Sequence, residues 1–150
     1  MTALGPERAG RWHCGDGVGP IRRRCQKRNF MQHVTGIGGL FFRAKNPTGM
    51  AQWYQENLGV DLGPADYTQK PWWQEAGPTV FAPFPQDSEY FGNAGKNWMI
   101  NFRVRDLDAM IAQLRAVKIE VSVDPEIYPN GRFARLQDPE GNPIELWEPK

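Results

Sequence analysis

Two stretches of this chain carry the apolar spacing of an amphipathic helix. Residues 107–117 repeat apolar side chains at intervals of three and four, and residues 47–58 do the same. This spacing gathers apolar side chains on one face of a helix. The apolar sets are Leu107, Met110, Ile111, Leu114 and Val117 in the later stretch, and Met50, Ala51, Trp53, Tyr54 and Leu58 in the earlier one.

Residues that flank these stretches favour helix boundaries. Asn46 and Asp106 directly precede them, and their side-chain oxygens can accept hydrogen bonds from the first helical amides. Pro47 takes the first helical position, where its missing N–H has no consequence. Gly59 suits the left-handed residue that follows a helix. We therefore expect one helix to begin at residue 47 and another at residue 107.

The chain also contains an internal repeat. Residues 42–50 align without a gap with residues 102–110, at an offset of 60, and each segment reads as an apolar strand, a basic residue, an N-cap and a helix. Residues 77–85 align with residues 141–149 at an offset of 64, and each has a glycine turn, a short strand and a closing proline. Two matches in the same order indicate a duplicated unit.

Each half leaves room for two more strands between its helix and its last strand. In the second half these are residues 121–123 and 132–137, and Gly141 is expected to take positive φ in the turn that follows. In the first half, residues 60–66 and 67–75 are the less distinct candidates. The sequence therefore predicts the order strand–helix–strand–strand–strand twice.

The expected fold is α+β, with two tandem βαβββ modules at about residues 34–92 and 97–150. The strands form a curved mixed sheet with a cleft, and the helices cover its outer face. Neighbouring strand residues point to opposite faces, so the uniformly apolar positions should pack against the helices. These positions are Leu40, Phe42, Ala44, Val80, Ala82, Ile100, Phe102, Val104, Ala134, Leu136, Ile144 and Leu146.

The opposite face mixes aromatic with polar side chains, which is typical of a ligand cleft. The candidate ligand-binding residues are Phe41, Arg43, Phe81, Met99, Asn101, Arg103, Phe133, Arg135 and Trp147, with Glu145 among them. A subunit interface, or a core with arginines at its rim, is the alternative interpretation of this face. Further aromatic residues are candidates either for a lid over the cleft or for core or dimer packing: Trp72, Trp73, Tyr90, Phe91 and Trp98.

Charge is distributed unevenly along the chain. The first thirty residues contain seven Arg or Lys and two Asp or Glu, whereas the other 120 contain eleven and fifteen. The patterned part therefore lacks the basic surplus of a nucleic-acid-binding protein. Residues 1–30 show no apolar period, and we expect a disordered or irregular extension there, with a basic nucleic-acid-binding arm as the alternative. Met31 opens the patterned sequence and is a possible alternative start.

Both cysteines, Cys14 and Cys25, fall in this extension. The patterned part has none, so its fold does not depend on disulfides, and a reducing cytoplasm is the expected compartment. No apolar run approaches the roughly 18 residues of a membrane span. We therefore expect a cytoplasmic protein that binds neither membranes nor nucleic acid.

Two segments resemble the vicinal oxygen chelate family, which includes glyoxalases, extradiol dioxygenases and bleomycin-resistance proteins. They are residues 42–59 and, more specifically, residues 138–149. The resemblance covers residues 31–150 and implies the fold described above, a small-molecule ligand and a homodimer. It implies no particular reaction, because members of this family differ in their chemistry.

Enzymes of this family bind a divalent metal through the first and last strands of both modules. The corresponding positions here are Gly39, Phe81, Met99 and Glu145, and only a carboxylate among them suits a hard divalent cation. We therefore expect no metal or other cofactor, with a divalent metal as the alternative. Glu145 would then be a buried carboxylate that pairs with an arginine, for which Arg43, Arg103 and Arg135 are candidates.

The function expected from the resemblance is binding of a small anionic or aromatic molecule in the cleft, without a metal. The alternative is a lyase or dioxygenase of the same family, with Glu145 as a catalytic base or as a metal ligand. A structural or partner-binding module without a ligand is the third possibility.

Overall fold

The computed structural model describes residues 32–150 except 62, 65, 67, 69, 93 and 94. The chain divides into two compact units, Met1–Gly39 and Leu40–Lys150. All the helices and strands described below belong to the second unit. The predicted extension, residues 1–30, lies outside the described residues.

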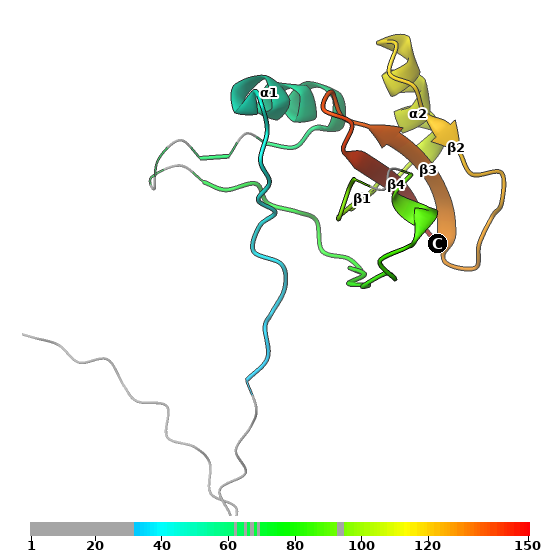
Figure 1. The fold of residues 1–150 in the computed structure, drawn as a ribbon, viewed down its shortest axis with the longest axis horizontal. Coiled ribbons are helices and arrows are strands. Elements are labelled where there is room, and N and C mark those ends of the chain that lie inside the picture. Colours follow the sequence, from blue (N-terminus) through cyan, green and yellow to red (C-terminus); the bar gives the residue numbers. More distant parts are fainter. Residues whose placement is uncertain (1–31, 62, 65, 67, 69, 93–94) are drawn as a thin grey trace, which may run out of the picture. The chain divides into compact units, whose positions relative to one another are not determined.

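The second unit is a small α+β structure built on a four-stranded mixed sheet (Figure 1). In chain order its elements are α1 (Pro47–Leu58), η1 (Glu89–Phe91), β1 (Ile100–Arg103), α2 (Leu107–Ala116), β2 (Ser122–Val123), β3 (Gly131–Gln137) and β4 (Pro143–Pro149). The strand order is β1-β4-β3-β2, with β1 parallel to β4 and the other pairs antiparallel. From β1 onward this is the predicted order strand–helix–strand–strand–strand, and Gly141 has the predicted positive φ, 72°.

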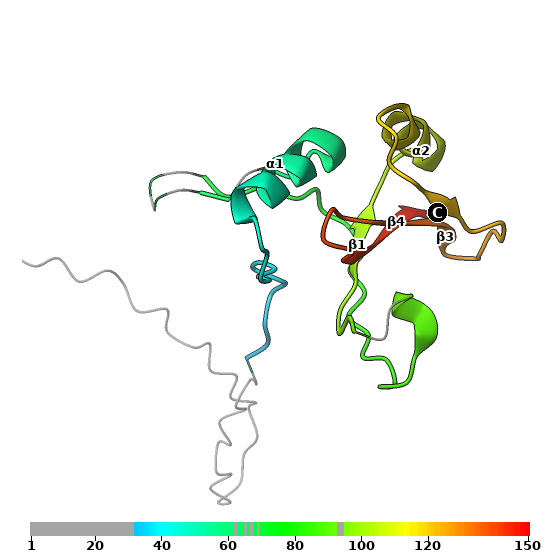
Figure 2. The ribbon, with the colours of Figure 1, turned by 45° about the horizontal axis from the view of Figure 1, so that its top comes forward.

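The core lies on one face of this sheet, under the helices. Leu107 and Leu114 of α2 are fully buried in the same apolar cluster as Ile144 and Leu146 of β4. Figure 2 shows both helices on one side of the sheet and η1 on the other. The register aligns the residues predicted to face the helices into two rows, Ile100–Ile144–Leu136 and Phe102–Leu146–Ala134.

The helix boundaries follow the predicted capping residues. The Asn46 side chain accepts a hydrogen bond from the Gly49 amide at 3.0 Å, and the Asp106 side chain accepts one from the Ala109 amide at 2.9 Å. Each bond satisfies an amide that has no partner within its helix. Gly59 ends α1 in the left-handed conformation, with φ of 67°.

The end of α2 differs from the prediction. The spacing places Val117 on the buried face, but Val117 is the C-cap residue and is 58% exposed. The chain turns there, because the amides of Lys118 and Ile119 donate to the carbonyls of Arg115 and Leu114. Lys118 takes the left-handed conformation, with φ of 64°, that glycine takes after α1.

The turn between β3 and β4 joins α1 to the sheet. The Asp138 carboxylate is buried and accepts hydrogen bonds from the Tyr54 hydroxyl at 3.0 Å and the Asn142 side-chain amide at 2.7 Å. The Glu140 carboxylate accepts the backbone amide of Lys45 at 2.8 Å, just before α1. Residues of this turn, which carry part of the family resemblance, therefore hold the first helix in place.

The described residues of the first half do not form the predicted strands. No described residue of 39–44, 60–66, 67–75 or 77–85 belongs to a strand. A strand exists only where a second segment accepts and donates its backbone hydrogen bonds. The segments corresponding to β1 and β4 lack such a ladder here, although their sequences repeat those of β1 and β4.

The apolar side chains of these segments are correspondingly exposed. Phe41 is 94% exposed and Phe81 is 90% exposed. The predicted packing of Val80 and Ala82 against a helix is wrong, because both are exposed. Phe42 keeps part of its expected environment, with its ring centroid 6.2 Å from that of Tyr54.

Candidate functional site

Three polar side chains form a row across the face of the sheet that is opposite the core. The register places Asn101 of β1 beside Glu145 of β4, and Glu145 beside Arg135 of β3. The neighbouring residues Ile144 and Leu146 point to the core, so the alternation of a strand sends Glu145 to the other face. This placement agrees with the faces predicted from the sequence.

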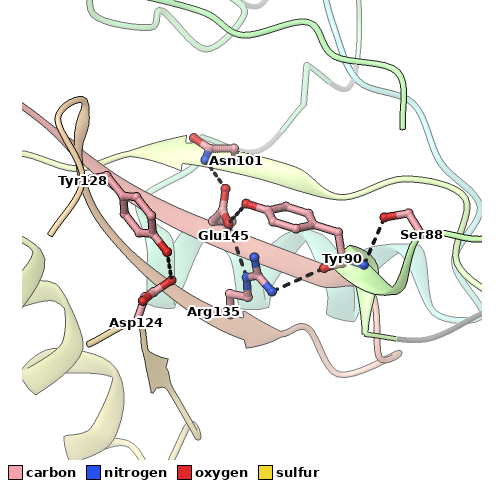
Figure 3. Close-up of polar contacts among 7 residues, drawn as sticks. All are labelled: Ser88, Tyr90, Asn101, Asp124, Tyr128, Arg135 and Glu145. Carbon is pink, nitrogen blue, oxygen red and sulfur yellow. Dashed lines mark hydrogen bonds and ion pairs between the residues drawn. The ribbon is translucent and has the colours of Figure 1, made fainter. Parts of the chain in front are cut away.

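The Glu145 carboxylate is the centre of a hydrogen-bond network, which we call the Glu145 network (Figure 3). Its Oε1 accepts the Tyr90 hydroxyl at 2.7 Å and Arg135 Nε at 3.3 Å, and its Oε2 accepts Asn101 Nδ2 at 2.7 Å. Glu145 is only 4% exposed. A buried carboxylate requires partners of this kind, because an unpaired charge is costly to remove from water.

Tyr90 is brought to this network by η1. The Ser88 hydroxyl accepts the Tyr90 amide at 3.2 Å and caps the short helix. The Arg135 guanidinium carbon lies 4.0 Å from the Tyr90 ring centroid, in a cation–π contact. Burial, followed by the hydrogen bond to Glu145, raises the pKa of the Tyr90 hydroxyl. Tyr90 therefore stays protonated and donates to Glu145 at neutral pH.

An aromatic pair lies in the next row of the same face. The register places Phe133 of β3 beside Trp147 of β4, and their rings are parallel within 5°, with centroids 6.2 Å apart. Trp147 Nε1 donates to the Asn130 carbonyl at 2.9 Å. Gly131 lets the indole nitrogen come this close, because a Cβ at position 131 would lie 2.7 Å from Trp147 Nε1.

The connection from β2 to β3 adds a second carboxylate beside the aromatic pair. The Asp124 amide donates to the Phe133 carbonyl at 3.0 Å, which fixes the backbone. The Tyr128 hydroxyl donates to Asp124 Oδ2 at 3.2 Å, and the Tyr128 ring meets the Phe133 ring edge-on at 5.7 Å. Burial, with a further contribution from Asp124, raises the pKa of Tyr128.

These side chains surround a cavity of about 250 Å³, which we call the Asp124 cavity. It is lined by Tyr90, Asp124, Tyr128, Asn130, Phe133, Arg135 and Glu145. A larger hollow of about 500 Å³ shares Tyr90 and Arg135 with it and extends to Met99 and the β3–β4 turn. The Asp124 cavity holds the carboxylates and the aromatic ring of Phe133, so it is the better candidate for specific binding.

The structure brings five of the predicted site residues together on this face: Asn101, Phe133, Arg135, Glu145 and Trp147. Of the three arginines considered as partners of Glu145, the one that pairs with it is Arg135. Arg103 lies on the same face but donates to the Glu75 carbonyl at 2.7 Å. Met99 lines the larger hollow.

The remaining predicted residues do not reach the Asp124 cavity. Phe41, Arg43 and Phe81 lie on the exposed first-half segments that form no strand. The lid prediction is only partly matched. Tyr90 reaches the cavity, whereas the rings of Trp72 and Trp98 contact Phe102 and Phe42, which are residues of the helix-covered side.

Three cavity residues were not selected from the sequence: Asp124, Tyr128 and Asn130. They belong to the connection between β2 and β3, where side-chain direction follows no strand or helix period. The one local signal was the Asn130-Gly131 turn pair before a strand, which favours a tight reversal of the chain. That signal predicts the turn but gives no direction for the side chains.

The residues present do not fit the metal site of the vicinal oxygen chelate fold. Glu145 already accepts three side-chain donors. The thioether of Met99 is a soft neutral ligand, and Phe81 offers no ligand atom and is exposed. Across the described ranges, no three His, Cys, Asp or Glu side chains are grouped so that they could bind a metal ion.

A sequence comparison places the chain in the vicinal oxygen chelate superfamily and identifies the family within it. The profile of the Glyoxalase-like domain family matches residues 39–147. The chain therefore belongs to the Glyoxalase-like domain family.

Several solved structures are similar to this chain. TnmS3, an antibiotic binding protein from Streptomyces sp. CB03234, is 26% identical over 70% of this chain and 88% of that one, with a TM-score of 0.45. A glyoxalase/bleomycin resistance protein from the same strain is 37% identical, but the match covers 33% of this chain and 42% of that one, with a TM-score of 0.30. A glyoxalase family protein from Bacillus anthracis is 24% identical over 68% and 84% of the two chains, with a TM-score of 0.44.

No curated protein sequence gives a significant match to the chain. None of the helices in the described ranges has the length and hydropathy of a membrane-spanning segment.

Proposed function

We propose that this protein binds a small aromatic molecule in the Asp124 cavity without a metal ion. The observation that carries the proposal is the Glu145 network. Glu145, which occupies a metal-ligand position of the family, accepts hydrogen bonds from three protein side chains, and one of these is the Arg135 guanidinium. A carboxylate held in this way stabilises the wall of a binding cavity.

The lining of the cavity supports an aromatic ligand. Phe133 is half-buried and stacks on Trp147, and Tyr128 meets Phe133 edge-on. Aromatic side chains bind flat rings through stacked and edge-to-face contacts, and each contact adds about 0.5–1.5 kcal/mol beyond the area it buries. A volume of about 250 Å³ is just below the usual range for ligand pockets, so a ligand of one or two rings is the expected size.

Thermal-shift and calorimetric screening of small aromatic compounds tests this proposal. A specific ligand should raise the melting temperature in proportion to its occupancy. Phe133→Leu keeps an apolar side chain but removes the ring, and it should weaken binding at least several-fold. Val117→Ala, at an exposed helix end, is the control that should leave binding unchanged. Binding that is equal in both variants would place the ligand elsewhere.

Metal analysis of the purified protein separates this proposal from the enzymatic alternative. A lyase or dioxygenase that uses Glu145 with a divalent metal requires about one ion per chain, and Glu145→Gln should then release it. The proposal predicts substoichiometric metal in both proteins. Stoichiometric metal that depends on Glu145 would favour the alternative.

We further propose that a homodimer completes the first module. In β1 and β4, Ile100 lies opposite Ile144. The repeat offsets of 60 and 64 relate Ile100 to Leu40 and Ile144 to Val80. Segments 40–44 and 79–83 would therefore pair as parallel strands, with the same register as β1 and β4. Their exposed side chains would be buried in this assembly. Light scattering should give twice the chain mass, and a monomer at all concentrations would contradict the dimer.

A further inference from the structure

The Asp124 cavity carries an unbalanced negative charge. Its lining residues include three charged side chains, Asp124, Arg135 and Glu145. Arg135 and Glu145 form an ion pair, with Nε and Oε1 3.3 Å apart, and neutralise each other. Asp124 takes part in none of the ion pairs found within the described ranges. The cavity therefore has a formal net charge of −1.

The partners of Asp124 are all neutral. Its Oδ1 accepts the Glu126 amide at 3.0 Å, and its Oδ2 accepts the Tyr128 hydroxyl at 3.2 Å. An ionised carboxylate has about four lone-pair positions, so each oxygen can accept a further donor. Asp124 is half-buried, and a charge-assisted hydrogen bond there is less screened by solvent than one on an open surface.

The arginine of the cavity is poorly placed to bind an anion. Arg135 Nε donates to Glu145, its Nη1 donates to the Tyr90 carbonyl at 3.4 Å, and its flat face lies on the Tyr90 ring. A ligand carboxylate would approach Glu145 and Asp124 as well as Arg135. Like-charge repulsion from two carboxylates would outweigh the attraction of one guanidinium that is already paired.

From these observations we propose that Asp124 gives the cavity a preference for aromatic ligands with a cationic nitrogen. The ammonium or amidinium group would donate to the Asp124 carboxylate, beside the ring faces of Tyr128 and Phe133. Aromatic faces attract cations, which adds to the same preference. This inference rests on the proposed function, and it replaces the anionic ligand expected from the sequence with a cationic one.

Three probes of one size and different charge test this selectivity. They are 1-naphthylmethylamine, which is cationic at pH 7, the neutral 1-naphthylmethanol and the anionic 1-naphthoate, each titrated by calorimetry at low salt. The amine should bind about tenfold more tightly than the alcohol, and the carboxylate should bind most weakly. Raised salt should reduce the preference for the amine and leave the alcohol unchanged.

Asp124→Asn is the decisive variant, because the amide oxygen can still accept the Glu126 amide and the amide nitrogen can donate to the Tyr128 hydroxyl oxygen. It should bring the amine to the affinity of the alcohol without weakening the alcohol. Asp108→Asn removes the same charge from an exposed carboxylate paired with Arg132, and as the matched control it should preserve the preference. Should Asp124→Asn fail to fold, Tyr128→Phe frees one lone pair of Asp124 and should keep or increase the preference for the amine.

The possible outcomes separate the two proposals. Equal binding of all three probes, or tightest binding of the carboxylate, overturns the charge preference and leaves aromatic binding in place. A preference for the amine that survives Asp124→Asn also overturns the role of Asp124. Failure of every probe to bind overturns both proposals.

Discussion

The C-terminal strands and the segments around α1 differ sharply in how much apolar surface they bury. Residues 100–149 contain most of the buried core, including four fully buried large side chains. Residues 40–92 contribute Met50 and Tyr54 to that core, while Phe41 and Phe81 are almost fully exposed. The two regions nevertheless carry repeated sequence segments, so composition does not explain the difference.

This difference in burial separates sequence signals that act within one element from those that need a distant segment of the chain. Helix α1 forms because Asn46, Pro47 and Gly59 fix its ends within the helix itself. A parallel strand pair must instead join segments about 40 residues apart, and β1 and β4 do so with α2 packed across them. The corresponding first-half segments, 40–44 and 79–83, lack that support within one chain.

The largest expected effect comes from the core of the second region. Leu146→Ala removes a fully buried side chain between β1, β3 and α2 and should lower the free energy of unfolding by about 2–5 kcal/mol. Val80→Ala, in the first-half segment 79–83, is the comparison substitution and should change it by less than about 0.5 kcal/mol in the monomer, because Val80 is 70% exposed. Urea denaturation measures both, and similar losses would show that the two regions are equally packed.

A smaller effect should come from the link between the two regions. Tyr54→Phe removes the hydroxyl that donates to Asp138 and should reduce stability by about 1 kcal/mol. Asp138 keeps its bonds from Asn142, so β3 and β4 should stay protected. Hydrogen exchange should therefore increase in α1 and not in the sheet. Uniform loss of protection would show that α1 and the sheet unfold as one unit.

The helix ends provide a smaller test of the same comparison. Gly59 and Lys118 both follow a helix with positive φ, but lysine is strained there. Lys118→Gly should stabilise the protein by about 0.5–1 kcal/mol, and Gly59→Ala should destabilise it by a similar amount. Thermal unfolding of the two variants should shift the melting temperature in opposite directions. A loss in both would show that Lys118 makes a stabilising contact.

The last test concerns the ionisation of Tyr54, which affects stability only in alkaline solution. Burial, and then the charge of Asp138, raises the pKa of Tyr54 far above its ordinary value of 10.0. The neutral hydroxyl therefore stabilises the fold fully below that pH, and this contribution is lost as the pH rises toward the folded-state pKa. Wild type should lose stability above pH 10 more steeply than Tyr54→Phe. Identical pH profiles would remove Tyr54 from alkaline unfolding.

The sequence predicted side-chain directions correctly where the two-residue alternation of a strand governs them. The faces of β1, β3 and β4 followed from alternation, and this placed Glu145, Arg135 and Asn101 together. It could not place Asp124 or Tyr128, because their directions depend on a connection without a period. The first-half strands were predicted from the internal repeat, but a strand also requires a hydrogen-bonded neighbour, which a repeated sequence does not by itself supply.

The three donors bound by Glu145 have a consequence for engineering this scaffold. New histidines or carboxylates on the neighbouring strands would not recreate a chelating centre, because the carboxylate would still be engaged by Tyr90 and Arg135. A designer would have to replace those two residues as well, and would thereby detach η1 from the sheet. Chelation and the attachment of η1 compete for the same carboxylate, because both Tyr90 and Arg135 bind its Oε1, so a variant that gains one is expected to lose the other.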